Sequence, residues 1–504
     1  MKEHIKIISR RSTLAKIQAK LVGNTLKSKY PDIKIEYSWI KTIGDIDQKL
    51  DISSGSSMGL FTSDISEKVM TSDNNIAVHS WKDYPIVENG YSNIYATIDR
   101  ADMRDVLILK NYLKNLKNIK TIKIMTSSPR RRYALNTYLK NLIPIQFKNI
   151  KFHDLRGNIN TRIKKFLDND ADGIVIAKAA LDRILNAKSS DINIKNNVNN
   201  CLREHHWIIL PLSLFPTAPG QGAIGIEINN TNQEMIKIIK TINVIDIYKN
   251  VKKEKEIMSK YGGGCSQKIG VSIWEKNNVT IQSINGKTDE NKVLQSFEII
   301  ERAATEPENN TTTKENAFPI SKKEQNIFTR INKNKNNQIS KIENAIIYIT
   351  RKNTLFNKPR FNNSCILWTS GIKSWRASCK SGYWIHGSSD SMGESDIESL
   401  FSLIQKKREI IKLTFKNNKN KNSNDINTYE LNNPIFPSDI ESRKEFYWMS
   451  SFAFEAAINK FPSIQNKKHA CGMGNTYNKL LSIINNKTNL TCYLDYKSWK
   501  KNLK

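Results

Sequence analysis

The sequence lacks the segments that would hold a protein in a membrane or export it. No run of about 18 apolar residues occurs, so a transmembrane helix is not expected. Residues 1–16 also lack the apolar stretch of a signal peptide. These absences predict a cytoplasmic protein that makes no membrane contact.

Cysteine is scarce, with 6 residues in 504. No two cysteines form a CxxC pair, so a zinc ribbon or a thioredoxin-like motif is not expected. A disulfide framework is equally unexpected in a long chain without an export signal. The adjacent pair His205 and His206 has no further Cys or His at metal-ligand spacing, so we predict no metal site.

Acidic residues are also in deficit. There are 48 Asp and Glu against 79 Lys and Arg, which gives a formal net charge of +31. Such a charge suits nucleic-acid binding if it is clustered. Here the lysines are scattered among Asn and Ile over the whole length, as an AT-biased genome would produce. We therefore favour the compositional explanation and expect no nucleic-acid partner.

What the sequence does contain is a regular alternation of strands and helices. Apolar strand patterns at 4–9, 33–40 and 75–80 alternate with helical patterns that begin after Ser12 and near residue 62. A second block repeats this pattern, with strands expected at 121–126, 148–154 and 173–177 and helices expected at 160–168 and 179–185. Strands separated by helices predict parallel sheets with crossovers, an α/β class.

Later residues differ from this pattern. Two helices (232–241 and 249–260) and three strands (268–274, 278–284 and 293–300) predict a small α+β domain. Residues 304–344 are polar and without apolar periodicity, which predicts a linker. A new strand at 345–350 begins a C-terminal α/β domain that runs to residue 504. Because few contacts are expected to cross such a linker, a chain ending near residue 310 is expected to fold alone.

Three strand-to-helix junctions carry cations and hydroxyl groups. A helix N-terminus offers unpaired N–H groups and a positive dipole end, so it favours an anion. Ser128 with Pro129 is a typical helix start. Each junction alone could be a solvated cap, but three together predict a region that binds carboxylates or phosphates. Its candidate residues are Arg10, Ser12, Ser128, Arg130, Arg131, Arg156, Arg162 and Arg183.

The strand at 75–80 ends in Lys82 and Asp83. Open α/β sheets place their sites at the carboxyl ends of strands. A carboxylate among arginines could stabilise a cationic intermediate, although a surface ion pair explains these two residues equally well.

The segment Gly262-Gly263-Gly264-Cys265 places a thiol in a glycine-rich loop. Glycines allow close backbone approach and leave the thiol accessible, which favours a nucleophilic or covalently modified cysteine. The Pro- and Gly-rich segment 218–223 is either an inter-domain crossing or an ordinary turn.

Taken in order, these elements resemble the hydroxymethylbilane synthase family, also called porphobilinogen deaminase. The resemblance covers about residues 4–300. The motifs that carry it are AVHSWKD (77–83), TSSPRR (126–131), LRGNINTR (155–162), APGQGAIGIE (218–227) and GGGC (262–265).

The resemblance implies two α/β domains like those of periplasmic binding proteins and a small α+β domain. The implied bounds are 1–98 with 207–230 for the first domain, 99–206 for the second and 231–303 for the third, followed by the linker at 304–344 and the domain at 345–504. The family joins four porphobilinogen molecules head to tail, with loss of ammonia, and water releases the hydroxymethylbilane of tetrapyrrole (porphyrin and heme) biosynthesis. Its members carry a dipyrromethane cofactor on a cysteine thioether. We expect the protein to act as a monomer.

By position, the resemblance makes Cys265 the attachment site and Asp83 the catalytic carboxylate. It assigns Lys82, Ser128, Arg130, Arg131 and Arg156 to the cofactor. It assigns Arg10, Ser12, Phe61, Arg162 and Arg183 to the substrate. One departure is Met58, which stands where the family usually has a lysine in the loop before Phe61. The alternative prediction is a non-catalytic anion-binding protein of the periplasmic-binding type, which would need neither Cys265 nor Asp83.

The C-terminal region has a weaker resemblance to uroporphyrinogen-III synthase. It is carried by YITRK (348–352), GYWIHGSSDSMGE (382–394) and the segment 447–481. That family closes the bilane with inversion of one ring and has two α/β lobes. Since 345–504 is short for two lobes, a reduced lobe is expected. A structural appendage without activity is the other interpretation.

Overall fold

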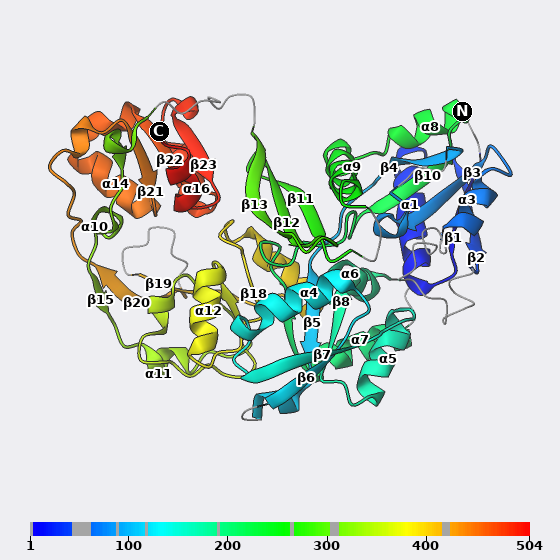
Figure 1. The fold of residues 1–504 in the computed structure, drawn as a ribbon, viewed down its shortest axis with the longest axis horizontal. Helices are drawn as coiled ribbons and strands as arrows, with labels where there is room; N and C mark the ends of the chain where they lie inside the picture. The colour runs from blue at the N-terminus through cyan, green and yellow to red at the C-terminus, as the bar shows by residue number, and fades with distance from the viewer. Residues whose placement is uncertain are drawn as a thin grey trace.

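The computed structural model describes residues 4–42, 62–86, 90–115, 119–188, 192–262, 267–302, 312–415 and 424–504. Figure 1 shows two α/β domains toward the right and the bottom, a small antiparallel sheet between them and the C-terminal region, and that region at the left. The predicted α/β class is confirmed.

The first sheet has the order β2-β1-β3-β10-β4. Its strands are β1 (His4–Arg10), β2 (Lys34–Ile40), β3 (Asn75–Ser80), β4 (Ser92–Ala96) and β10 (Ile224–Asn229). β1 pairs in parallel with β2 and β3, whereas β10 is antiparallel to β3 and β4. The associated helices are α1 (Thr13–Lys29), α3 (Ser63–Val69) and α8 (Gln233–Lys240).

The position of helix α8 corrects the predicted domain division. The prediction placed α8 in the third domain, but it packs on the first sheet. Met235 and Ile239 of α8 lie in one hydrophobic cluster with Ile5 and Ile7 of β1. The reason is local, because α8 follows β10 after a short turn and covers the sheet that β10 has just joined.

The second sheet has the order β7-β6-β8-β5-β9. Its strands are β5 (Asp105–Leu109), β6 (Ile119–Met125), β7 (Phe147–His153), β8 (Gly173–Ala177) and β9 (His206–Ile209). Its helices are α4 (Pro129–Tyr138), α5 (Ile159–Asp168), α6 (Lys178–Asn186) and α7 (Ile192–Glu204). β5 is antiparallel to β8, as β10 is to β3, so the two sheets share one topology.

The third sheet contains β11 (Gly270–Lys276), β12 (Val279–Lys287) and β13 (Val293–Arg302), all antiparallel, with α9 (Ile245–Ser259) against β11. Glu254 of α9 is fully buried and joins this domain to the others. Its carboxylate pairs with Arg100 at 2.8 Å and accepts hydrogen bonds from the backbone N–H groups of Gly220 and Ile273.

The C-terminal region has two sheets. One has the order β15-β20-β19-β16-β17-β18 and the other β14-β21-β22-β23. The strands of the first are β15 (Arg330–Asn332), β16 (Ile346–Ile349), β17 (Ile366–Thr369), β18 (Gly387–Ser388), β19 (Ile410–Phe415) and β20 (Ile426–Leu431). Those of the second are β14 (Ala317–Phe318), β21 (Glu445–Trp448), β22 (Lys468–Gly472) and β23 (Leu490–Tyr493). The helices are α10 (Lys322–Gln325), α11 (Asn336–Ile339), α12 (Ile372–Lys380), α13 (Phe401–Ile404), α14 (Ser451–Lys460), α15 (Asn475–Ile483) and α16 (Tyr496–Lys501).

Residues 312–344 are therefore not the predicted linker. β14 pairs with β21 and β15 pairs with β20, so this polar segment contributes a strand to each sheet. Phe318 and Ile339 are buried at 2% and 1% exposure. The segment has no periodicity because its few apolar residues pack one at a time on distant elements. Each of the strands β14 and β15 lies at the edge of its sheet, and the C-terminal region has two sheets where a reduced lobe was expected.

The C-terminal region packs directly on the second domain. The two hydrophobic clusters that contain β5, β6 and β8 also contain residues of β16 and β17. Indole N–H groups cross the interface, from Trp375 to the Leu142 carbonyl at 2.9 Å and from Trp384 to the Trp207 carbonyl at 3.2 Å. This shared core is the opposite of the few contacts expected across a linker.

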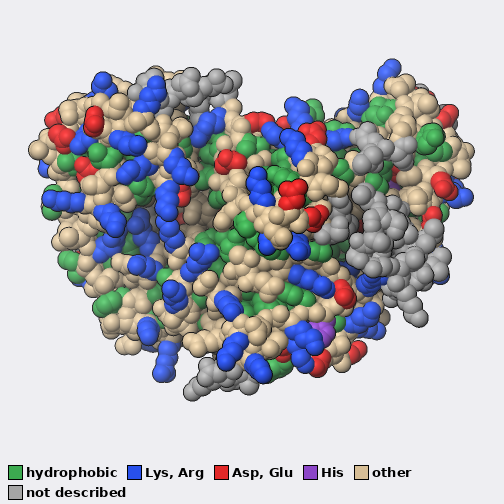
Figure 2. Space-filling model, viewed as in Figure 1, with side chains coloured by type: hydrophobic (Ala, Val, Ile, Leu, Met, Phe, Trp, Pro, Cys, Tyr) green, Lys and Arg blue, Asp and Glu red, His purple; other side chains and the backbone are tan. Residues whose placement is uncertain are grey.

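Across the described residues, no helix is both long and apolar enough to cross a bilayer. In the view of Figure 2, Lys and Arg side chains are spread over all parts of the visible face. That distribution agrees with the compositional explanation of the positive charge.

Candidate active site

The carboxyl end of β3 leads into Asp83, the predicted catalytic residue, and Lys82, a predicted cofactor-binding residue. β3 ends at Ser80, and a single turn of 3₁₀-helix, η2 (Trp81–Asp83), follows it. Ser80 exchanges hydrogen bonds with Gln18 of α1 at 2.9 and 3.0 Å, and the Trp81 N–H donates to the Ala223 carbonyl at 3.0 Å. The Trp81 ring is buried, whereas Asp83 is exposed. The buried tryptophan therefore anchors the turn and leaves the carboxylate accessible.

Arg10 and Ser12 lie at the same edge of the first sheet. β1 and β3 are parallel neighbours with Ile8 opposite Ala77, so their carboxyl ends are adjacent. Ser12 is the N-cap of α1 and accepts a hydrogen bond from the Ala15 N–H, as its position predicted. The first predicted junction and the Asp83 turn thus belong to one site.

The second junction is built on a buried carboxylate that the motifs did not identify. Ser128 caps α4, as predicted, and Pro129 is the first helical residue. Arg130 and Arg131 are buried, and both bind Asp105, with nitrogen-to-oxygen distances of 3.0 and 2.6 Å. Burial alone would raise the pKa of Asp105, but the two guanidinium groups hold it well below its usual range.

The third junction contributes Arg156 and Arg162. Asn158 caps α5, and the Nε–H of Arg162 donates to the Gly157 carbonyl at 2.7 Å. Burial lowers the pKa of Arg162 to about 10, an effect that Arg131 and Arg10 strengthen and Asp83 opposes. These mutual interactions place residues of both α/β domains in one group.

The charges around Arg162 also act on Lys82. Its side chain is half-buried. Burial lowers its pKa, and the neighbouring Arg131 and Arg162 lower it further, while Asp83 and Asp105 oppose the shift. We call Arg10, Lys82, Arg131 and Arg162 the cation cluster. Because burial and neighbouring cations lower the pKa values of Lys82 and Arg162, the cluster favours the binding of added negative charge.

Arg183 contacts the segment that crosses between the two α/β domains. Its guanidinium donates to the Gly222 carbonyl at 2.7 Å and pairs with Asp99 at 3.3 Å. The residue therefore supports the crossing segment between the domains, and a direct substrate contact stays a prediction.

Three residues named by the resemblance, Met58, Phe61 and Cys265, lie outside the described residues. The chain on either side of the cysteine loop is described. Gly262 precedes it with a φ of +91°, and Gly270 follows it. At Gly270 a side chain would lie 2.2 Å from the Pro216 carbonyl oxygen and 2.9 Å from Cδ of Arg130. Glycine is therefore required there, and the segment after the loop packs against the second junction.

The predicted site residues did not include Asp105 and Glu227, although Glu227 is the last residue of the motif at 218–227. The available signals were weak. Asp105 opens a strand of apolar residues, and Glu227 interrupts the apolar strand β10. A buried carboxylate in a strand must be paired, and here the partners are Arg130 and Arg131 for the first and His79 for the second.

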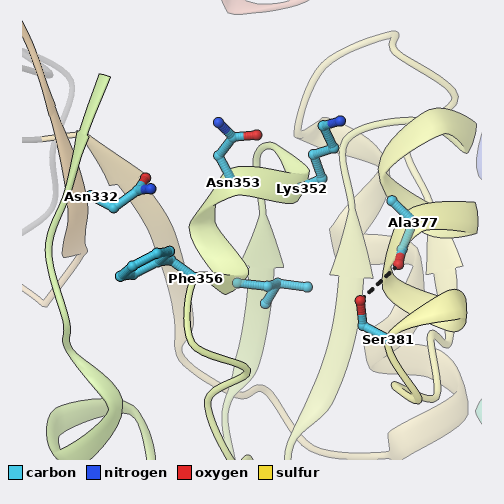
Figure 3. A pocket seen from close by; sticks show the side chains of 7 residues that line it. Asn332, Lys352, Asn353, Phe356, Ala377 and Ser381 are labelled. Atoms are coloured by element: carbon cyan, nitrogen blue, oxygen red, sulfur yellow. Dashed lines mark hydrogen bonds between the residues drawn. The ribbon is translucent and has the colours of Figure 1, made fainter. Parts of the chain in front are cut away.

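A separate cavity of 310 Å³ lies in the C-terminal region (Figure 3). It is lined from β15, from the 3₁₀ turn η6 (Lys352–Leu355) that follows β16, and from α12 and the residue after it. The lining combines an ammonium group, two amides, a hydroxyl and an aromatic ring, from Lys352, Asn332, Asn353, Ser381 and Phe356.

Comparisons with known proteins agree with this geometry. The family described as "Porphobilinogen deaminase, dipyromethane cofactor binding domain" matches residues 5–237. The porphobilinogen deaminase of Chlorobium phaeovibrioides is 33% identical over 308 residues, covering 61% of this chain and 90% of that protein. The probable porphobilinogen deaminase of Picrophilus torridus is 36% identical over 289 residues, which cover 57% of this chain and 92% of that protein.

A third relative, the porphobilinogen deaminase of Fusobacterium nucleatum, is 35% identical over 272 residues, covering 54% of this chain and 83% of its own length. These three relatives, each above 30% identity, are covered over 83–92% of their own length. The family match spans both sheets that carry the cation cluster. The chain therefore belongs to the porphobilinogen deaminase family.

Proposed function

We propose that this chain is a hydroxymethylbilane synthase that uses Asp83 and the cation cluster to join four porphobilinogen molecules. Each condensation releases one ammonia, and water releases the finished bilane. The observation that carries the proposal is the exposed Asp83 carboxylate beside cations from both α/β domains. The cytoplasmic location and the monomeric state belong to this proposal, and a monomer is expected on size-exclusion chromatography.

The cation cluster fits the dipyrromethane cofactor of the family. Each pyrrole ring of cofactor and substrate carries an acetate and a propionate. Burial, together with neighbouring cations, lowers the pKa values of Lys82 and Arg162, so a nearby anion would stabilise their charged forms. Carboxylates would supply that anion and form charge-assisted hydrogen bonds. When bound, the cofactor supplies the first pyrrole to which substrate units are added.

Asp83 would act on the incoming substrate. Loss of ammonia from porphobilinogen leaves a cationic azafulvene, and a carboxylate beside it stabilises that charge. The same carboxylate can hold the pyrrole N–H and assist proton transfer. The anchored Trp81 keeps the turn in place, so little reorganisation is needed when charge develops.

Cys265 is the proposed attachment site, and the other cysteines support this by exclusion. Cys201, Cys365, Cys379, Cys471 and Cys492 are all buried. Burial raises the pKa of Cys201 and of Cys379 to about 12, which keeps these thiols protonated and unreactive. In intact-mass analysis, wild-type protein should carry the dipyrromethane mass and Cys265→Ala should not. An adduct that survives on the alanine variant would refute this assignment.

The test of the function is Asp83→Asn with Asp32→Asn as its control. Asn is nearly isosteric but cannot balance a cation, so turnover should fall by about 10²–10⁴ while the adduct mass stays. Asp32 is exposed in a turn of the same domain, and its variant should keep wild-type turnover. Retention of more than about a tenth of the rate by Asp83→Asn would contradict the catalytic role of Asp83. Wild-type protein without any turnover would instead favour a non-catalytic anion-binding protein.

A second activity, uroporphyrinogen-III synthase, is proposed for the C-terminal region. The observation that favours it is the presence of two α/β sheets within residues 312–504, which suits a two-lobed enzyme. Lys352 belongs to the YITRK segment and lines the 310 Å³ cavity, where an ammonium group can hold a substrate carboxylate.

The isomer of the product tests this second activity. Full-length protein supplied with porphobilinogen should yield the ring-inverted type III product, whereas spontaneous closure yields type I. Lys352→Ala should shift the product toward type I at an unchanged rate of porphobilinogen consumption. Lys373→Ala, an exposed change on α12 outside the cavity, is the control. A wild-type enzyme that yields type I alone would indicate a purely structural region.

A further inference from the structure

A fully buried carboxylate lies beneath the Asp83 turn. Glu227 of β10 has no exposed surface. Its Oε2 lies 2.7 Å from Nε2 of His79, and its Oε1 accepts hydrogen bonds from the hydroxyl groups of Ser92 at 2.5 Å and Tyr84 at 3.2 Å. Ser66 donates a further hydrogen bond, so the two oxygens are held by donors from four separate positions.

Two of these donors flank the catalytic turn. His79 is the next-to-last residue of β3, and Tyr84 directly follows Asp83. One carboxylate thus binds both ends of the segment 79–84. Between these ends the side chain of Lys82 is half-buried and that of Asp83 is exposed.

A further contact fixes the end of the turn from another domain. Nζ of Lys255, a buried residue of α9, donates to the Tyr84 carbonyl at 2.7 Å. The rings of His79 and Tyr84 also pack with centroids 5.4 Å apart. Together these contacts restrict both the side chain and the backbone at Tyr84.

Stability alone does not explain this arrangement. Burial would raise the pKa of Glu227, but hydrogen bonds from His79, Ser92 and Ser66 hold it below its usual value. Buried ion pairs often contribute no more stability than apolar residues of equal volume. The Glu227 carboxylate instead orients its neighbours, because each hydrogen bond restricts the angle as well as the distance of the donor side chain.

We propose that Glu227 is a positioning residue that holds Asp83 in its reactive geometry by binding His79 and Tyr84 on either side of it. This rests on the proposed role of Asp83 as the charge-stabilising carboxylate. A displacement of about 1 Å at a reacting group can lower a rate by 10². The effect should therefore fall on kcat rather than on substrate binding.

The test compares Glu227→Gln and Tyr84→Phe with wild-type holoenzyme. Glu227→Gln replaces one acceptor oxygen by a donor, and we expect kcat to fall by about 10–100-fold at an unchanged KM for porphobilinogen and an unchanged adduct mass. Tyr84→Phe keeps the ring but removes the hydroxyl, which lies 3.2 Å from Glu227 and 3.3 Å from the Ser92 carbonyl. A smaller fall in kcat of about 3–10-fold is therefore expected.

The control is Glu445→Gln in the C-terminal region. Glu445 is also buried and accepts a hydrogen bond from the Trp499 indole at 2.6 Å, but it lies on β21, far along the chain from the turn. It should lower the melting temperature and leave kcat at low temperature unchanged. A purely structural role for Glu227 would give this same result, and that outcome would overturn the proposal.

The remaining outcomes are also decisive. If Glu227→Gln does not fold, Tyr84→Phe decides alone, and an unchanged kcat in that variant overturns the proposal. If Asp83→Asn loses turnover while Glu227→Gln and Tyr84→Phe both keep it, only the positioning role of Glu227 fails. If Asp83→Asn keeps its turnover, the proposed catalytic role of Asp83 fails instead, and the positioning role fails with it.

Discussion

Arg131 forms a two-point contact with Asp105, through Nε at 3.1 Å and Nη2 at 2.6 Å. Arg130 donates to the same carboxylate at 3.0 Å, and the amide group of Gln221 also donates to it, at 2.9 Å. Two arginines predicted to bind ligand carboxylates thus already bind a carboxylate of the protein. We infer that Asp105 sets the orientation in which these two arginines would meet a ligand.

We expect Asp105→Asn to destabilise the protein strongly. The change leaves two buried guanidinium groups without their counter-charge, which typically costs about 3–5 kcal/mol. Chemical denaturation would measure it. The control is Asp154→Asn, which removes the exposed partner of Arg132 on the same helix and should change the free energy of unfolding by about 0–1 kcal/mol. Equal effects of the two variants would contradict this account.

Arg131→Gln and Arg162→Gln should differ in stability while both impair elongation. Arg131 compensates a buried carboxylate, so its loss should destabilise the protein. Burial and neighbouring cations lower the pKa of Arg162 to about 10, so its charge costs free energy in the unliganded protein. Its removal should leave the melting temperature unchanged or raise it.

Native mass spectrometry at limiting porphobilinogen would check the elongation part of this prediction. Each variant should accumulate an intermediate with a particular number of pyrrole units. The same measurement extends to Arg130 and Arg156. A uniform loss of all intermediates, together with a lowered melting temperature for Arg162→Gln, would indicate a folding defect.

Removal of residues 303–504 should damage the rest of the protein. The second domain shares its hydrophobic clusters with β16 and β17, so the shortened chain would expose apolar surface. We expect aggregation or a clearly lowered melting temperature. A monomeric shortened chain with an unchanged melting temperature would show that the interface contributes little.

A single side chain tests the same interface in the full chain. Trp375→Ala deletes a fully buried ring and its hydrogen bond to Leu142, and should cost about 3–5 kcal/mol. Lys373→Ala, two residues away and exposed, should have little effect on the free energy of unfolding.

His469 should make the C-terminal region acid-sensitive. Burial lowers its pKa to about 4. Its Nδ1 accepts from the Trp448 indole at 3.0 Å and its Nε2 lies 3.2 Å from the Gln465 carbonyl, which is the pattern of a neutral ring. The unfolded chain takes up a proton near pH 6.5 and the folded chain does not. Stability is therefore full above pH 6.5 and falls as the pH drops toward 4, by roughly 3 kcal/mol.

Denaturant unfolding at several pH values, followed by tryptophan fluorescence, would measure this loss. His469→Gln lacks the titrating ring, so its stability should lack this part of the pH dependence. A wild-type curve that stays flat between pH 6.5 and 4 would contradict the prediction.

The sequence by itself determined the α/β class, most strands of the first two sheets and the helix caps Ser12 and Ser128. β3 begins and ends at the predicted residues, 75 and 80. These features depend on neighbours a few residues apart, such as alternating apolar residues or a hydroxyl before a helix. The motif order also determined the family, because its residues lie at junctions that local signals identify.

Only the tertiary structure decided how distant segments meet. The partners His79 and Glu227 are 148 residues apart, and Asp105 meets Arg131 across 26. Residues 312–344 have no periodic pattern, because their short strands are stabilised by pairing with β20 and β21 rather than by their own sequence. The docking of the C-terminal region is likewise long-range. Local patterns report which residues are apolar or charged, but the partner that buries or neutralises each one is set by the packing of the whole chain.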